Sequence, residues 1–217
     1  MTQITSCLFV LTVFSADLFA QSYKGHPWHD SIQTIPGTIQ CEFYDGGGEG
    51  IAYHDADAVN NGSGKLNPND GSFLNTFRMN EGVDISYTKT NTTDDNPYNV
   101  VEPLMEQLYV GWTEPGEWIN YTIEIQKAGT YHVSLMYTAN ADGKISLSLD
   151  GKDISGKVLV RSTYHFKDTV AWRQWHHWNK AENLATVTLP EGKHILTLRT
   201  VDNGNMNYDY VEFAFVE

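Results

Sequence analysis

The chain has 217 residues, with 27 acidic and 14 basic side chains and a formal net charge of −13. This charge disfavours nucleic acid, anionic lipid membranes and polyanionic glycans as main partners, because an acidic surface repels all three. A neutral ligand or a cation suits the chain better. The length is that of one all-β domain with a substantial core.

The first 20 residues predict an export signal. An apolar run from Cys7 to Phe14 is too short to cross a bilayer, and Leu18-Phe-Ala20 is typical of a cleavage site. The segment contains no Lys or Arg, and the alternative is a buried first strand. Export predicts a secreted or periplasmic protein. Removal of the signal would leave Cys41 as the only cysteine, so we expect Cys41 to be a small buried hydrophobe and no internal disulfide to form.

Polar residues and prolines dominate the next stretch, so we predict a polar leader over residues 21–37 and one folded domain over residues 38–217. A first strand is expected within Ile35–Tyr44. Residues 45–50 and 55–71 are rich in Gly, Asn and Asp and predict loops.

A short strand is expected over residues 83–87, and the weakly patterned residues 88–107 predict a long surface loop. The clearest periodicity follows in residues 117–126 and 130–138, where apolar and polar side chains alternate on either side of an Ala128-Gly129 turn. This period of two indicates half-buried antiparallel strands. Further strands are expected at 109–112, 144–149, 157–161, 184–189, 193–201 and 207–216. Such spacing predicts an all-β protein, a β-sandwich of jelly-roll type.

No familiar catalytic motif is present in the sequence. The chain has no Gly-x-Ser-x-Gly, no His-Glu-x-x-His and no glycine-rich phosphate loop. Asp55 to Gly62 departs from the EF-hand pattern, and the adjacent His176 and His177 would face opposite sides of a strand. A pair of acids acting as in a glycosidase stays open, although no acid stands out by its context.

Aromatic residues are the stronger indication of function. Six Trp, twelve Tyr and nine Phe exceed what a core of this size needs. A flat aromatic ring covers the apolar C–H face of a sugar, while amides and carboxylates pair with the surrounding hydroxyl groups. This composition favours a carbohydrate-binding protein.

An ordered set of motifs makes the indication specific. The motifs are Ile39-Gln-Cys-Glu-Phe-Tyr44, Gly50-Ile-Ala-Tyr-His-Asp55, Phe77-Arg-x-x-Glu-Gly-Val-Asp-Ile85, Tyr109-Val-Gly-Trp-Thr-x-x-Gly-Glu-Trp-Ile-Asn-Tyr121, Ala128-Gly-Thr-Tyr131, Leu149-Asp-Gly151, Trp172-x-x-Trp175 and Asn207-Tyr-Asp-Tyr-Val-Glu-Phe213. Together they resemble a family 6 carbohydrate-binding module. Residues 88–107 and 164–170 are longer than the corresponding loops usual in that family.

The resemblance implies a jelly-roll sandwich without catalysis and a sugar-binding cleft among the loops at one edge. By motif position, Phe77 and Trp172 would sandwich a sugar ring, Asn207 would close the floor, and Tyr53 would add a polar contact. The alternatives are a core position for Phe77 and a turn-capping role for Asn207. By their strand context, Trp112, Trp118 and Trp175 are expected to pack in the core.

The resemblance also implies a structural calcium ion. Gln40, Glu42 and Asp209 would hold it together with backbone carbonyls, since calcium takes six to eight oxygen ligands. The ion would join the first and last strands and stabilise the domain. The alternative is that Glu42 is an ordinary strand acid.

Three hypotheses follow. The first is a secreted non-catalytic module that binds a neutral plant- or algal-type polysaccharide or oligosaccharide of the β-glucan or xylan class. Such a module would be a partner or a fragment of a glycoside hydrolase. The second is a small glycoside hydrolase or lyase on the same scaffold, with His54, Asp55, His176 or Glu49 at its cleft. The third is a calcium-dependent structural or adhesive protein, which predicts buried side chains at Phe77 and Trp172.

Overall fold

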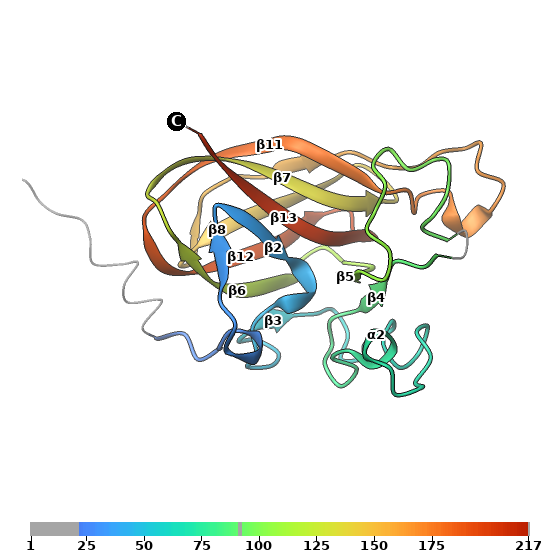
Figure 1. Cartoon of the computed structure of the whole chain (residues 1–217), viewed down its shortest axis with the longest axis horizontal. Helices are drawn as coiled ribbons and strands as arrows, with labels where there is room; N and C mark the ends of the chain where they lie inside the picture. The colour runs from blue at the N-terminus through green and yellow to red at the C-terminus, as the bar shows by residue number, and fades with distance from the viewer. Residues whose placement is uncertain (1–21, 91–92, 217) are drawn as a thin grey trace, which may run out of the picture.

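The computed structural model describes residues 22–90 and 93–216, so the predicted export signal lies outside the described part. Two β-sheets pack face to face (Figure 1). The first has the order β1-β6-β12-β8-β10, with β3 beside β6 and β9 beside β8. The second has the order β11-β7-β13-β5-β4, with β2 beside β13. The predicted all-β sandwich is confirmed.

The strands of the first sheet are β1 (Gln33–Ile35), β3 (Tyr53–His54), β6 (Trp118–Ile125), β8 (Gly143–Leu149), β9 (Lys152–Asp153), β10 (Val158–Val160) and β12 (Gly192–Asp202). Those of the second are β2 (Gly37–Gln40), β4 (Ile85–Tyr87), β5 (Leu108–Val110), β7 (Gly129–Ala139), β11 (Asn179–Leu189) and β13 (Met206–Val216). Short helical turns occur at η1 (Trp28–Asp30), η2 (Cys41–Phe43), α2 (Phe73–Thr76) and η3 (Ala171–Arg173). Within these described ranges, no helix is long and apolar enough to cross a membrane.

The core lies between the sheets and follows the predicted alternation. In β8 every second side chain is buried, from Ile145 to Leu149. In β6, Tyr121 and Ile123 point into the core, but their polar neighbours Asn120 and Thr122 are buried as well. A half-exposed strand was expected there. The polar face of β6 is covered because the chain between β2 and β3 packs along it.

That N-terminal segment corrects the expected domain boundary. Residues 33–35 form β1, which runs parallel to β6, and Ile35 is fully buried. The sheet therefore begins inside the predicted polar leader, before residue 38. The expected strand Ile35–Tyr44 is also divided: β1 belongs to the first sheet, β2 to the second, and η2 follows β2. Pro36 stands between the two strands, where its missing N–H breaks no ladder hydrogen bond.

Asp45 completes the edge of β6 between β1 and β3. Its carboxylate accepts hydrogen bonds from the Thr122 backbone N–H, at 2.8 Å, and from the Thr122 hydroxyl, at 2.7 Å. The Tyr23 hydroxyl donates to the same carboxylate. Two buried polar groups of the strand are thereby satisfied by a residue far away in sequence.

Two long loops lie side by side at one end of the sandwich (Figure 1). They are residues 88–107, between β4 and β5, and residues 161–178, between β10 and β11. The Tyr98 hydroxyl of the first donates to the Lys167 carbonyl of the second, at 3.0 Å. The sequence places both on the surface, and the tertiary fold brings them together.

Candidate functional site

An open hollow of about 380 Å³ lies beside the segment that follows β5. The half-buried indole of Trp112 lines it together with Leu66. Apart from Ala56, the rest of the wall is polar: Asp55, Asp57, Asn61, Asp84, Glu114, Glu117 and Asn205. One aromatic ring surrounded by amides and carboxyl groups is the combination that a sugar ring requires.

The backbone at Trp112 is strained. Its φ is 46°, in the left-handed region that bulky residues avoid. Hydrogen bonds hold the strained segment on both sides: Gly111 N–H donates to the Asp84 carbonyl, and Trp112 N–H donates to Asn207 Oδ1 at 2.9 Å. Such strain persists only where the surroundings enforce it, and it concentrates at functional sites.

Two carboxyl groups of the hollow, those of Asp55 and Glu117, have raised pKa values. Burial raises the pKa of Asp55 to about 8, and the charge of Glu117 adds to the shift. Burial likewise raises the pKa of Glu117 to about 7, against hydrogen bonds from the N–H groups of Glu114 and Ala56. Because a protonated carboxyl both donates and accepts hydrogen bonds, these two groups can pair with either function of a hydroxyl group.

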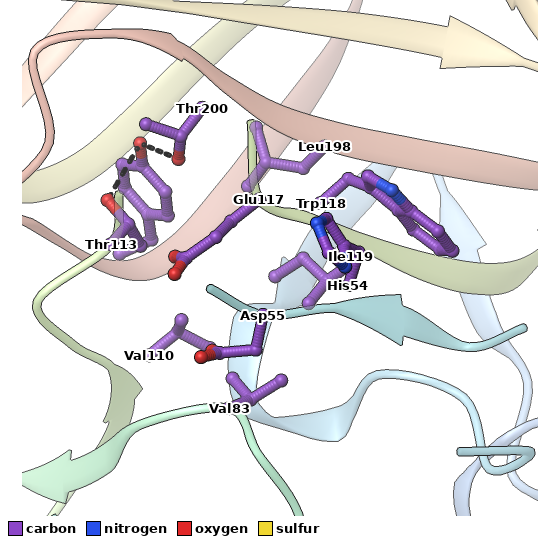
Figure 2. A pocket seen from close by; sticks show the side chains of 11 residues that line it. His54, Asp55, Val83, Val110, Thr113, Glu117, Trp118, Ile119, Leu198 and Thr200 are labelled. Carbon is purple, nitrogen blue, oxygen red and sulfur yellow. Dashed lines mark hydrogen bonds between the residues drawn. The ribbon is translucent and has the colours of Figure 1, made fainter. Parts of the chain in front are cut away.

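Asp55 and Glu117 also border a small cavity of about 20 Å³ beneath the hollow. Figure 2 shows both carboxyl groups at this cavity, Asp55 directly after β3 and Glu117 directly before β6. Val83 and Val110 form part of its apolar wall. This apolar surrounding explains why ionisation of the two acids is disfavoured.

Phe77 does not line this hollow. Its ring is 4% exposed and makes edge-to-face contacts with Trp28, Phe43 and Phe73 at centroid distances of 5.3, 5.9 and 5.2 Å. Neither face of the ring is open to a ligand in this arrangement. The core position, considered above as the alternative, is the one that the structure shows.

Asn207 is fully buried at the start of β13. Its Oδ1 accepts from Trp112 N–H, and its Nδ2 donates to the Thr138 hydroxyl at 2.8 Å. The side chain thus lies behind Trp112 and holds its backbone. A direct contact between this amide and a ligand, as the resemblance implied, would require these bonds to open.

Tyr53 is also buried, at 5% exposure, and packs edge-to-face on Tyr44. Its hydroxyl accepts a hydrogen bond from Gly82 N–H at 3.1 Å. The ring touches a second hollow, of about 410 Å³, next to Glu49 and Asp57. The hydroxyl group is therefore engaged in holding the chain rather than presented to solvent.

Trp172 lies in η3, at the tip of the 161–178 loop, and is 60% exposed. Tyr164 and Phe166 of the same loop are exposed as well. Within residues 22–90 and 93–216, no ring contact joins Trp172 to Phe77. Because the buried Phe77 ring has no open face, it cannot stack on a sugar opposite Trp172, and the buried position that an adhesive protein would predict holds for Phe77 alone.

The 161–178 loop is braced from inside. Asp168 accepts from Arg173 Nε at 2.7 Å and lies 2.9 Å from His177 Nε2. The bond from Arg173 lowers the pKa of Asp168, against the effect of burial. His176 instead contacts Asp94 of the other loop. The neighbouring histidines therefore face different carboxylates, as their adjacency predicts.

Trp112 is the site residue that sequence reasoning missed. Its place in an apparent strand favoured the core, whereas β5 ends at Val110, two residues earlier. The available signal was the Thr113-Glu-Pro-Gly116 turn directly after it, because a ring next to a turn tends to lie at a sheet edge. Trp118 and Trp175 are half-buried rather than fully buried.

Gln40, Glu42 and Asp209 form a second cluster, between β2, η2 and β13. Glu42 and Asp209 are buried, and one oxygen of each, Oε2 and Oδ1 respectively, has no hydrogen-bond partner. Gln107 Nε2 donates to Glu42 Oε1 at 3.0 Å and to Gln40 Oε1 at 3.2 Å. Buried polar atoms are nearly always satisfied, so the two open oxygens are available to a cationic partner.

The pKa values of Glu42 and Asp209 are both raised, as expected for two buried carboxyl groups without a cation beside them. Burial raises the pKa of Glu42 well above its usual range, and the charge of Asp209 raises it further. Burial raises the pKa of Asp209 to about 7. Among the described residues, no group of three or more His, Cys, Asp and Glu side chains is suited to a metal. Two carboxylates with amide oxygens fit calcium, which prefers oxygen donors and accepts carbonyls.

Comparison with known proteins assigns the family. The model of the carbohydrate binding module (family 6) matches residues 76–216, which is more than half of the chain. The chain therefore belongs to carbohydrate-binding module family 6, as its motifs predicted. The match includes Phe77, Trp112, Trp172 and Asn207, whereas Gln40 and Glu42 precede it. No curated protein sequence matches the chain.

Several solved structures are similar to this chain. A family 6 module of Clostridium stercorarium in complex with cellobiose is 15% identical, with a TM-score of 0.49, over 86% of this chain and 98% of that one. A β-1,3-glucan-binding family 6 module of Bacillus halodurans is 15% identical, with a TM-score of 0.47, over 85% and 99%. A family 43 arabinoxylan arabinofuranohydrolase of Bacillus subtilis is 15% identical, with a TM-score of 0.48, over 86% and 28%.

Proposed function

We propose that this chain is a non-catalytic module that binds a neutral polysaccharide of the β-glucan or xylan class outside the cytoplasm. The observation that carries the proposal is the half-buried indole of Trp112 in an open hollow lined by amides and carboxyl groups. Family membership and the net charge of −13 support a neutral glycan. The module would raise the effective concentration of a glycoside hydrolase on its substrate.

Each part of the hollow has a defined role in this proposal. The Trp112 ring covers the apolar face of one sugar unit. The side chains of Asn61 and Asn205, and the protonated carboxyl of Asp55, pair with its hydroxyl groups. Trp172, exposed in η3 of the 161–178 loop, stacks on a further unit of an extended polysaccharide. One stacking site and a few hydrogen bonds correspond to modest affinity, about 10⁻³ to 10⁻⁵ M.

Affinity gel electrophoresis through a panel of neutral polysaccharides tests the proposal. Wild-type protein should be retarded by one β-glucan or xylan, and Trp112→Ala should migrate freely in the same gel. Phe73→Ala is the matched control, because Phe73 is an exposed aromatic on α2 that does not line the hollow. Equal retardation of wild type and Trp112→Ala would show that the hollow is not the binding site.

We also propose that a structural calcium ion is held by Gln40, Glu42 and Asp209. The unpartnered oxygens of Glu42 and Asp209 support it. Gln107 brings the end of the 88–107 loop to the same cluster and carries a further amide oxygen. Bound calcium would neutralise both buried carboxylates and join η2 to β13.

A glycoside hydrolase is the second candidate function. It is favoured by two carboxyl groups with raised pKa, Asp55 and Glu117, at one cavity, because a general acid needs such a shift. An assay for released reducing ends on the same polysaccharide panel decides between the two. Release that disappears in both Asp55→Asn and Glu117→Gln would establish the enzyme, and no release by wild type would exclude it for those substrates.

A further inference from the structure

A buried chain of hydrogen bonds connects the 88–107 loop to the Trp112 backbone. Trp112 N–H donates to Asn207 Oδ1, and Asn207 Nδ2 lies 3.0 Å from His176 Nδ1. His176 Nε2 in turn lies 2.6 Å from Asp94 Oδ1. Asn207, His176 and Asp94 are all buried. This series of hydrogen bonds thus runs from the candidate binding hollow to a loop that is unusually long in this protein.

The direction of every bond in this chain is determined by its partners. Because a backbone N–H can only donate, Asn207 must present Oδ1 to Trp112 and its NH₂ group to the other side. That group has two hydrogens, one for the Thr138 hydroxyl and one for His176 Nδ1. His176 Nδ1 must therefore accept, so the single ring proton lies on Nε2 and is donated to Asp94.

Asp94 is the last member of this series of hydrogen bonds and is itself held by further donors. Its carboxylate also accepts from Trp178 Nε1 at 2.7 Å and from Lys89 N–H at 2.7 Å. Although burial opposes ionisation, the bonds from His176 and Trp178 lower the pKa of Asp94. An ionised acceptor in a buried place holds the His176 ring firmly. The Val100 N–H, which donates to the Trp178 carbonyl, attaches the 88–107 loop a second time.

We propose that His176 and Asp94 are positioning residues of the carbohydrate site. His176 Nδ1 holds the Asn207 amide in one orientation, and this amide holds Trp112 in its left-handed conformation at the hollow. Without an acceptor at Nδ1, the amide loses one of its three hydrogen bonds, so it holds the strained Trp112 backbone less firmly and the indole shifts from its place. The proposal rests on the function proposed above, since it assumes that Trp112 contacts the sugar.

Two substitutions of His176 distinguish the role of Nδ1 from the role of Nε2. His176→Asn places an amide oxygen near the Nδ1 position and loses the bond to Asp94. His176→Gln reaches the Nε2 position and keeps a donor for Asp94, but it offers no acceptor to Asn207. Both variants lose one buried hydrogen bond, so we expect similar decreases in Tm. We expect His176→Asn to bind within about twofold of wild type and His176→Gln to bind about tenfold more weakly.

Isothermal titration with the polysaccharide identified by the gel panel gives the Kd values, and differential scanning calorimetry gives the Tm values. A residue with a merely structural role would make Kd follow Tm, so both variants would weaken binding alike. That result, or equal binding by both variants and wild type, would overturn the proposal.

Nuclear magnetic resonance gives a readout that needs neither ligand nor variant. In wild-type protein, nitrogen shifts of the His176 ring should show a protonated Nε2 and an unprotonated Nδ1, and the reverse tautomer would contradict the chain of bonds. In His176→Gln, but not in His176→Asn, the Trp112 backbone amide resonance should shift. If Trp112→Ala binds like wild type while these spectra agree with expectation, the carbohydrate site is misplaced but the positioning chain stands.

Discussion

The Gln40–Glu42–Asp209 cluster and the Trp112 hollow show two ways in which a site arises. In the first, sequence motifs named three residues and the structure places them together, because β2 pairs with β13 in a fixed register that sets Gln40 opposite Tyr210. In the second, motifs named Phe77, Trp172 and Asn207, but the structure buries Phe77 and Asn207 and leaves only Trp172 exposed. Strand pairing brings residues that are far apart in sequence together, whereas the exposure of a side chain depends on which remote segments pack over it.

Removal of the proposed calcium ion should have the largest effect on stability. With the ion gone, two buried carboxylates would face each other without a cation, so we expect EDTA to lower Tm by on the order of 10 °C. Differential scanning calorimetry measures the change, and excess calcium should reverse it. Glu42→Gln should make Tm insensitive to EDTA. An unchanged wild-type Tm in EDTA would mean that no stabilising ion is held at the Gln40–Glu42–Asp209 cluster.

Trp112→Ala should have the largest effect on binding. Loss of the ring that covers the sugar removes most of the apolar contact, and we expect Kd to rise at least about tenfold. Isothermal titration measures Kd, and circular dichroism should show an intact sandwich, since Trp112 lies outside the strands. Binding that survives this change would move the site elsewhere on the loops.

The acids of the hollow should make stability depend on pH. The folded-state pKa of Asp55 is raised to about 8. The resulting stabilisation of the folded state is therefore fully present below the unfolded pKa of about 4 and is lost as pH rises through 8. Because Asn does not ionise, Asp55→Asn should not lose stability in this way. The Tm of the variant should therefore gain on wild type between pH 5 and pH 8.5 in a thermal scan. A constant difference across that range would show that Asp55 ionises normally in the folded protein.

Trp172→Ala should have the smallest effect. The side chain is 60% exposed, so little packing is lost and Tm should stay the same. If the ring stacks on a second sugar unit, retardation by a long polysaccharide decreases about threefold, while binding of a single sugar unit does not change. Parallel gels with polymer and titrations with monosaccharide test this. An unchanged retardation would leave the hollow as the whole of the binding surface.

Much of the fold is predictable from local patterns. The strands expected at 117–126 and 130–138 are β6, at 118–125, and β7, at 129–139, and the last strand differs from β13 by one residue at its start. Burial of Cys41 is confirmed. The N-terminal boundary was less accurate, because β1 has only three residues and little periodicity of its own. Pairing with β6, about 90 residues further along the chain, defines it as a strand.

The sequence by itself determined the all-β sandwich and the family, and it named Gln40, Glu42 and Asp209, which the structure places in one cluster. Period-two alternation and ordered motifs are local signals, and strand pairing turns them into neighbours in space. Only the tertiary structure decided that Phe77 is covered by Trp28, which comes from the predicted leader, and that Trp112 stands at an open hollow. Exposure of a ring depends on which remote segment packs over it, and the residues around the ring in sequence carry little information about that segment.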